Sequence, residues 1–345
     1  MPFENFFGNH TAVALLESMA ERGRIPQTIL VSGPEGVGKA TLARRFAASL
    51  LGHAAQIETD DLSRPHNAEL LAAREKLTAE KRAEDPFILA SYPDFVTFAP
   101  DGPLRQISIQ QMRLLKERAR FGPLEGRHRV FLIDGIDRAN EQAANSLLKI
   151  LEEPPPYLIL FLTAENPYDL LVTIRSRSVP LHLTALSDGD MRAFAAAREL
   201  ADADRRVALA AGSPGIACSI DLAAYDKRRD AMRALLNTAS GAAPFSDWAA
   251  QAEKAALARS EKLDRYLKVL YLLLEDLLHL REGQGPIRNA DIGPDLLRLA
   301  QAVSFEWLRE AVVKTDILMR QVRRNIQKSI ALDALALELR SIAGL

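Results

Sequence analysis

The first half of the chain alternates short apolar runs with helical stretches. Several of these runs are apolar at consecutive positions, as expected of strands that are buried on both faces. The runs occupy residues 28–32, 94–99, 129–134, 158–163 and 179–183. Such alternation predicts an α/β domain, in which helices cover both faces of a doubly wound parallel sheet.

From Thr184 onward the pattern is helical, and no further strand is predicted. Glycine and proline interrupt it at 212–215, 241–244 and 282–286. Between 259 and 281, apolar residues recur at three-four spacing, which gives a long helix one apolar stripe. The stripe consists of Leu263, Tyr266, Leu267, Leu270, Leu273, Leu274, Leu277 and Leu278. A helix of this kind buries its stripe against other helices, so the second half is predicted to be all-helical.

The most polar part of the chain, residues 56–85, sets Glu, Asp, Lys and Arg among alanines. Alanine and the long charged residues favour helix, and the charged residues favour contact with water. We interpret this region as an exposed helical insertion between the first two predicted strands.

Composition narrows the class of protein. With 345 residues and 48% hydrophobic content, the chain is long enough for two or three packed domains. Its 44 Lys and Arg nearly balance its 45 Asp and Glu, so any contact with nucleic acid must be local. The sequence contains neither a basic segment followed by an apolar core at its N-terminus nor an apolar run of about 18 residues. This predicts a cytoplasmic protein without a targeting or membrane segment.

Cysteine usage limits the metal chemistry. Cys218 is the only cysteine, which excludes an internal disulfide and a zinc site built from four cysteines or from cysteine and histidine pairs. We therefore expect no metal site, unless magnesium accompanies a nucleotide.

A glycine-rich segment follows the first predicted strand and precedes a helical stretch. We call it the phosphate loop; it consists of Gly33, Pro34, Glu35, Gly36, Val37, Gly38, Lys39, Ala40 and Thr41. Glycines let backbone N–H groups turn towards a phosphate, the helix N-terminus adds its positive dipole end, and Lys39 supplies a cation. The alternative is a glycine-rich turn, but the strand and helix on either side favour nucleotide binding.

One position of the phosphate loop departs from the full motif. After Lys39 the pattern requires Ser or Thr, whose hydroxyl binds magnesium, and this chain has Ala40. Thr41 comes one residue late, and a shift of one residue on a helix turns a side chain by about 100°. Metal-assisted hydrolysis is therefore expected to be impaired.

A second acidic position lies at the end of the third predicted strand. Asp134 has the place of the Walker-B-like aspartate that holds magnesium in phosphate-loop ATPases, but the next residue is Gly135, where hydrolytic enzymes carry a water-activating Glu. Asp137 is expected to face away from the site. Alternatively, Asp134 caps a helix that begins near Arg138.

Four segments together resemble a known family. They are the phosphate loop, 134–140, 144–155 and 173–178, and they occur in the order seen in the AAA+ subunits of bacterial DNA polymerase III clamp loaders. The block from Asn145 to Pro155 is the most specific. Segments 107–130 and 212–215 resemble the delta-prime type of subunit more than the motor type. The resemblance is strong over 1–220 and rests on helical pattern alone over 226–345.

This resemblance implies an architecture and a set of partners. The expected parts are an AAA+ domain at 1–184, a helical lid at 185–225 and a C-terminal helical collar for oligomerisation at 226–345. The expected partners are the motor (gamma/tau) and delta subunits, with the sliding clamp and primer-template DNA reached through the complex. The chain would then be a subunit of the DNA polymerase III holoenzyme.

The resemblance also singles out Arg177. Ser176, Arg177 and Ser178 match the family's Ser-Arg-Cys motif with Ser in place of Cys. In that family the arginine reaches the nucleotide of the adjacent subunit, where a guanidinium stabilises the phosphoryl group in transfer. The alternatives are a surface arginine without a role, or Arg175 in the same role.

Other family features are changed here. Gly215 stands where motor subunits carry a lid arginine, and the polar sensor falls near Ala164 and Glu165, with Thr163 and Asn166 close by. The interval that carries a zinc module in many loader subunits has His53 and His66 but no cysteine, which predicts no zinc. We thus expect a subunit that binds ATP or ADP weakly, requires no cofactor and does not turn ATP over. The competing hypotheses are an autonomous motor ATPase of the same family and a small-molecule kinase.

Candidate DNA contacts follow the second predicted strand. Arg113, Lys116 and Arg120 are spaced to form one exposed basic stripe on a helix, as phosphate tracking requires. The alternative is a solvated helix face, since no aromatic residue interrupts the stripe.

Overall fold

The computed structural model describes residues 3–251, 262–321 and 327–344. The chain divides into two compact units. The first comprises the described residues up to Leu200 together with Gly212–Ile216, and the second comprises Ala201–Ala211 and the residues from Ala217 onward. The predicted three-part division at 184 and 225 stays a prediction. In the described ranges, none of the helices is both long enough and apolar enough to cross a membrane.

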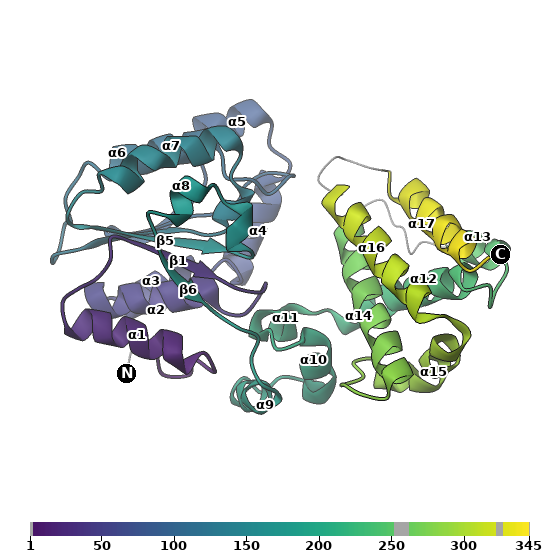
Figure 1. The fold of residues 1–345 in the computed structure, drawn as a ribbon. Helices are drawn as coiled ribbons and strands as arrows, with labels where there is room; N and C mark the ends of the chain where they lie inside the picture. Colours follow the sequence, from purple (N-terminus) through teal and green to yellow (C-terminus); the bar gives the residue numbers. More distant parts are fainter. Residues whose placement is uncertain (1–2, 252–261, 322–326, 345) are drawn as a thin grey trace. The chain divides into compact units, whose positions relative to one another are not determined.

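A six-stranded sheet forms the centre of the first unit (Figure 1). Its strands are β1 (Thr28–Ser32), β2 (Ile88–Tyr92), β3 (Phe95–Phe98), β4 (Arg129–Ile133), β5 (Leu158–Ala164) and β6 (Val179–His182). The order across the sheet is β2-β3-β4-β5-β1-β6. All neighbours are parallel except β2 and β3. The five predicted strands are confirmed, and β2 is an additional antiparallel edge strand.

Helices cover both faces of this sheet, as predicted. They are α1 (His10–Glu21), α2 (Lys39–Leu51), α6 (Ile109–Arg118), α7 (Glu141–Glu152) and α8 (Val172–Arg175), and α9 (Asp188–Ala197) follows β6 along the chain. Figure 1 shows α6 and α7 on one face and α1 and α2 on the other. On the α2 face, the rings of Phe46 and Phe161 meet edge to face with centroids 5.6 Å apart. On the other face, Leu147 of α7 packs with Phe131 of the sheet in one buried cluster.

The predicted insertion is helical, but it is not simply exposed. It contains α3 (Ala54–Ile57), the 3-10 helix η1 (Glu58–Asp60), α4 (Pro65–Arg74) and α5 (Ala79–Glu84). Leu71 packs with Phe87 and Ala99 in a small apolar cluster. The Arg74 guanidinium is buried and donates to the Asp101 carboxylate at 2.8 and 3.0 Å. The expectation of a solvated insertion is wrong in this respect, because these contacts fix it against the sheet.

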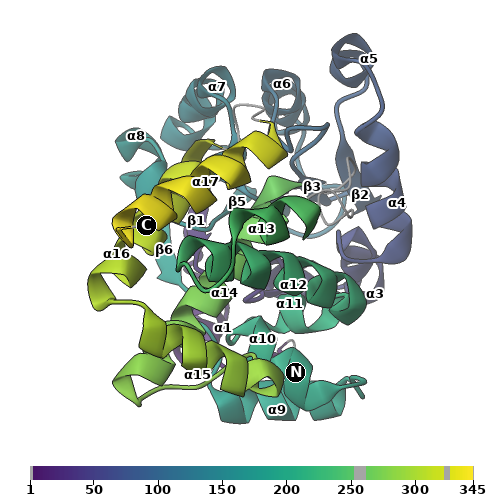
Figure 2. The ribbon, with the colours of Figure 1, turned by 90° about the vertical axis from the view of Figure 1, so that its right-hand side faces the viewer.

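The second unit is helical over its described residues. Its helices include α10 (Ala203–Ala210), α12 (Leu222–Ala239), α13 (Phe245–Gln251), α14 (Leu263–Glu282), α15 (Gly293–Ala302), α16 (Phe305–Gln321) and α17 (Lys328–Ile342). α12 packs against α13, α14 and α17, while α14 packs against α15 and α16 (Figure 2). The predicted apolar stripe is buried on α14 except for the partly exposed Leu278. Residues 259–261 of the predicted helix lie outside the described residues.

Candidate functional site

The phosphate loop connects β1 to α2 and is shaped by glycines that no other residue can replace without strain. Gly33 has a φ of 146°, and a Cβ there would lie 2.2 Å from the carbonyl oxygen of Leu183. Gly36 has a φ of 74°. Gly38 precedes the first residue of α2. The predicted sequence of strand, glycine loop and helix is therefore present.

Lys39 lies inside this loop and is bonded to it. Its Nζ donates to the backbone oxygens of Gly33 and Pro34, both at 2.7 Å. Burial lowers the pKa of Lys39, while the nearby carboxylates of Glu165 and Asp134 oppose that shift. The ammonium thus has intramolecular partners that a bound phosphate would have to replace.

The hydroxyl that would bind magnesium after Lys39 is absent, and the hydroxyl of Thr41, one residue later, has another partner. Ala40 has no donor atom at the metal position. Thr41 Oγ1 accepts a hydrogen bond from Arg44 Nη2 at 3.3 Å. Arg44 is buried and also forms ion pairs with Glu58 and Asp61 in the insertion. Thr41 therefore helps to join α2 to the insertion.

Asp134 contacts a threonine on the neighbouring strand. Thr163 Oγ1 donates to Asp134 Oδ1 at 2.6 Å and accepts from the backbone N–H of Gly135 at 2.8 Å. The cap interpretation of Asp134 is wrong, because the short 3-10 helix η2 (Ile136–Arg138) has no side-chain cap. Among the residues suggested for the polar sensor, Thr163 is the one that lies beside Asp134.

Two further acidic residues lie in this site. Asp137 was expected to face away, but its Oδ2 accepts from the backbone N–H of Glu165 at 3.2 Å and its charge acts on Lys39. Burial raises the pKa of Asp137, and the Glu165 charge adds to the shift. Glu165 also pairs with Arg138 at 3.2 Å. An anion entering the loop would therefore meet carboxylates as well as the lysine.

At Gly215, where the family resemblance led us to compare this chain with the lid arginine of motor subunits, the backbone contacts the phosphate loop. The N–H of Gly215 donates to the oxygen of Gly36 at 2.8 Å. A Cβ at Gly215 would lie 3.0 Å from the Cα of Gly36. The segment around Gly215 thus touches the phosphate loop at a point that has little room for a side chain.

Arg177 lies on the surface, in the turn between α8 and β6. Its Nη1 donates to the Thr173 oxygen at 3.0 Å, and its Nη2 pairs with Glu152 Oε1 at 3.0 Å. About a third of its side chain, 34%, is exposed. Arg175, the alternative candidate, instead places its guanidinium over the ring of Tyr168, 5.1 Å from the centroid.

The phosphate loop and Arg177 lie at opposite ends of the strands. β1 and β6 are parallel, with Ile29 opposite Val179 and Ser32 opposite His182. The loop follows the carboxyl end of β1, whereas Arg177 precedes the amino end of β6. Three residue steps along a strand separate the two ends by roughly 10 Å. Arg177 is therefore not part of the site formed by its own phosphate loop.

The candidate DNA stripe is divided by the end of a helix. Arg113 is exposed and Lys116 partly buried on α6, which begins with a capping box made by Ser108 and Gln111. Arg120 is exposed but lies in the turn beyond the end of α6 at Arg118. The spacing had predicted that the three side chains lie on one helix, and this prediction is wrong because α6 ends before Arg120.

Metal ligands are not clustered in the described ranges. No group of three or more His, Cys, Asp or Glu residues there could hold a metal ion. His53 stacks on Tyr92 with centroids 4.5 Å apart and pairs with Glu125 at 3.3 Å. The absence of zinc stays a prediction that elemental analysis can test.

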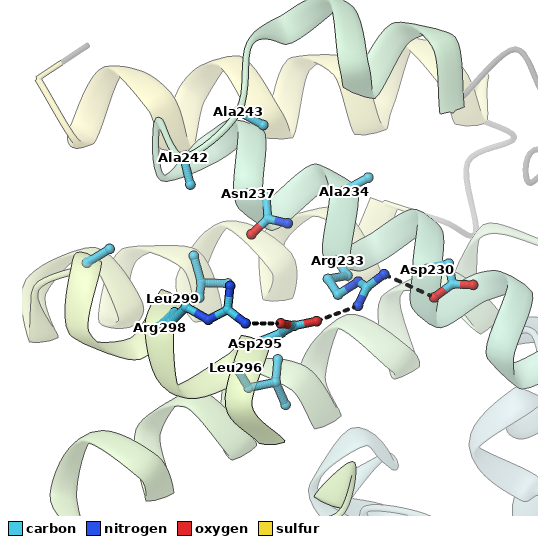
Figure 3. A pocket seen from close by; sticks show the side chains of 11 residues that line it. Asp230, Arg233, Ala234, Asn237, Ala242, Ala243, Asp295, Leu296, Arg298 and Leu299 are labelled. Atoms are coloured by element: carbon cyan, nitrogen blue, oxygen red, sulfur yellow. Dashed lines mark hydrogen bonds and ion pairs between the residues drawn. The ribbon is translucent and has the colours of Figure 1, made fainter. Parts of the chain in front are cut away.

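A hollow of about 640 Å³ lies in the second unit between α12 and α15 (Figure 3). Its charged side chains pair with one another. Asp295 accepts from Arg233 at 3.0 Å and from Arg298 at 2.8 Å. Leu296 and Leu299 supply apolar lining. Because its charges are matched internally, the hollow has no net charge that would select a ligand.

Together, the strand order, the phosphate loop and the acidic residue after β4 define the class: an AAA+-type phosphate-loop module followed by helices. A protein-family model described as DNA polymerase III, delta subunit, matches residues 8–187, just over half of the chain. The chain belongs to this family of clamp-loader subunits.

Two curated relatives from DNA polymerase III agree with this assignment. The delta' subunit of DNA polymerase III from Pseudomonas aeruginosa is 32% identical over 167 residues, which cover 48% of this chain and 45% of the relative. Subunit tau/gamma from Haemophilus influenzae is 29% identical over 186 residues, 54% of this chain and 24% of the relative. The matched regions span less than half of these curated relatives. A solved gamma subunit-related protein from Thermotoga maritima is 15% identical with a TM-score of 0.47, over 95% of this chain and 99% of that one.

Proposed function

We propose that this chain is the non-hydrolysing, delta-prime type of clamp-loader subunit. In this role it holds its neighbours in the assembly and supplies Arg177 to the ATP site of an adjacent motor subunit. Its partners would be the motor (gamma/tau) and delta subunits, and it would act on the sliding clamp and primer-template DNA within the complex.

The observation that carries the proposal is the separation of Arg177 from its own phosphate loop. The loop follows β1 at one end of the strands, and Arg177 precedes β6 at the other end. Any nucleotide that a guanidinium in that position serves would lie outside this chain's own site. The loop itself has Ala40 in place of the metal hydroxyl and Gly135 in place of the water-activating Glu.

The proposed chemistry in the neighbour is electrostatic. As the γ-phosphoryl group transfers to water, negative charge develops on its oxygens, and a guanidinium fork can donate to two of them at once. Arg177 would supply that fork without becoming a covalent participant. In its own site, this chain would bind ATP or ADP weakly, because Lys39 must first exchange two carbonyl partners for phosphate oxygens.

The collar and DNA assignments belong to the same proposal. Helices α12–α17 would pack with the corresponding helices of the partner subunits, and Arg113, Lys116 and Arg120 would contact the DNA backbone. The exposure of Arg113 and Arg120 supports the DNA contact. The salt dependence of DNA binding by the complex would fall if these three cations were replaced.

The purified chain provides the first test. We expect background ATP turnover and weak ADP binding that does not depend on magnesium, because the metal ligand is missing. Co-expression with the motor and delta subunits followed by size-exclusion chromatography should give one complex. A magnesium-dependent steady-state rate that Lys39→Ala abolishes would contradict the proposal.

A second candidate, an autonomous motor ATPase of the same family, is favoured by one observation. The Thr163 hydroxyl lies 2.6 Å from Asp134, where a polar group can respond to a bound phosphate. The same turnover measurement distinguishes the two functions.

A further inference from the structure

The guanidinium of Arg177 is exposed, but it also contacts α7 and α8 of its own chain. One guanidinium nitrogen donates to the backbone of Thr173, and a second pairs with Glu152, each at 3.0 Å. Two nitrogens of one planar group are thus bound to two different elements. A plane that is held at two points has a defined orientation, whereas a plane held at one point can rotate about that contact.

Both anchors are fixed by the core of the sheet domain. Glu152 is the last residue of α7, whose Leu151 is buried in the cluster above the sheet. Thr173 lies on α8 beside Ile174, which belongs to the same cluster and is 1% exposed. Ser178 Oγ donates to the oxygen of Ile174 at 2.8 Å and closes the turn. The backbone positions of both anchors are therefore set by packing, while the side chain of Glu152 is itself 52% exposed.

Neighbouring residues of the same types lack this arrangement. Arg175 is turned over the ring of Tyr168 and forms no ion pair within the described ranges. Glu153, next to Glu152, makes no side-chain hydrogen bond or ion pair to any described residue. The double anchor thus belongs to Arg177 and Glu152 in particular, and Glu153 offers a matched control.

We propose that Glu152 is a positioning residue that orients Arg177 towards the nucleotide of the adjacent subunit; this rests on the function proposed above. A guanidinium has five N–H donors. The contacts with Thr173 and Glu152 use two of them, and the three that remain are enough for a fork that meets two phosphate oxygens. Glu152 acts through Arg177 and does not itself touch the phosphate.

The experiment is steady-state ATP turnover by the reconstituted loader with primed DNA and clamp. Five forms of this chain are compared with the wild type: Glu152→Ala, Glu152→Gln, Arg177→Ala, the double variant of Glu152→Ala with Arg177→Ala, and the control Glu153→Ala. We expect Glu152→Ala to lower kcat about tenfold, the effect of losing one charge-assisted hydrogen bond, and to leave KM for ATP within about twofold. The double variant should be no slower than Arg177→Ala alone, and Glu152→Gln should recover part of the loss because its amide oxygen still accepts.

The possible outcomes separate the two proposals. If Arg177→Ala is slow while Glu152→Ala turns over at the wild-type rate or faster, the positioning role is wrong and the arginine assignment survives. A loss by Glu152→Ala that persists in the Arg177→Ala background, or an equal loss by Glu153→Ala, also overturns the positioning role. If Arg177→Ala turns over normally, the proposed function itself fails, and the role of Glu152 fails with it.

Discussion

The phosphate loop and the turn that carries Arg177 are two cationic sites of one domain, and they hold their cations in opposite ways. Lys39 is partly buried and donates to two carbonyl oxygens of its own loop. Arg177 is exposed, and its two contacts orient the guanidinium without using all of its donors. The lysine has partners within the chain, while the arginine keeps donors for an external anion.

The difference extends to the chemistry around each cation. Near Lys39, the metal hydroxyl and the water-activating carboxylate are missing, and Asp137 and Glu165 add negative charge. Near Arg177, Glu152 is the carboxylate in contact among the residues that the structure describes, and it pairs with the guanidinium. Under the proposed function, this phosphate-loop domain lacks residues that ATP hydrolysis requires and carries an arginine that serves a neighbour's ATP site.

The largest expected effect concerns the shape of the Arg177 side chain. In the assembled loader, Arg177→Lys should reduce ATP turnover at the served site towards the roughly 10³-fold loss that follows removal of an arginine finger. An ammonium keeps the charge but lacks the planar fork that meets two phosphate oxygens. Turnover by the Lys variant within twofold of wild type would show that charge alone is needed.

The phosphate loop should matter for folding even without ATP turnover. Gly33→Ala should lower the free energy of unfolding by about 3 kcal/mol, because the new Cβ would lie 2.2 Å from the Leu183 oxygen at a strained φ. Gly23→Ala is the control, since Gly23 also has a positive φ but nothing lies within 4 Å of its Cβ position. Denaturant unfolding should show about 1 kcal/mol for the control. Equal losses in the two variants would contradict the close packing of the loop.

Restoring one missing residue should not restore hydrolysis. Gly135→Glu introduces the carboxylate of motor subunits at a position with a φ of 76°. We expect a loss of about 1 kcal/mol in unfolding free energy from the left-handed backbone. We expect no ATP turnover by the isolated chain, since Ala40 still lacks the metal ligand. Measurable turnover by this single variant would mean that the site is otherwise intact.

The smallest effect is the pH dependence that Lys39 imposes. Burial holds the pKa of Lys39 below its ordinary 10.5, so between the lowered value and 10.5 the unfolded chain binds more protons than the folded chain. Unfolding free energy should therefore rise with pH through that window relative to Lys39→Met. Denaturation of both proteins at neutral and alkaline pH measures the difference. Parallel pH profiles would show that the lysine is not held in the loop.

Much of the sheet could be predicted from sequence because its central strands are apolar at consecutive positions. β2 was missed because it is an antiparallel edge strand whose residues are mostly half-buried or exposed. The insertion was expected to be solvated because its charges dominate the pattern. Contacts such as that of Arg74 with Asp101, 27 residues apart, cannot be seen in a local window.

The candidate site was predicted unevenly for the same reason. The phosphate loop is a contiguous motif, so spacing alone revealed both its presence and the replacement at Ala40. Thr163 was one of several adjacent candidates, and only strand register places it beside Asp134. Glu152 lay in a block noted for family resemblance, but its pairing with Arg177 depends on how α7 and α8 pack on the sheet.

The most direct test of the account compares Lys39→Ala with Arg177→Ala in the reconstituted loader, with DNA- and clamp-stimulated ATP turnover as the readout and size-exclusion chromatography as the check on assembly. The account predicts that both complexes assemble, that Arg177→Ala lowers turnover strongly and that Lys39→Ala leaves it near the wild-type rate. The opposite result, a slow Lys39→Ala complex and a normal Arg177→Ala complex, would show that this chain uses ATP in its own site and supplies no arginine to its neighbour.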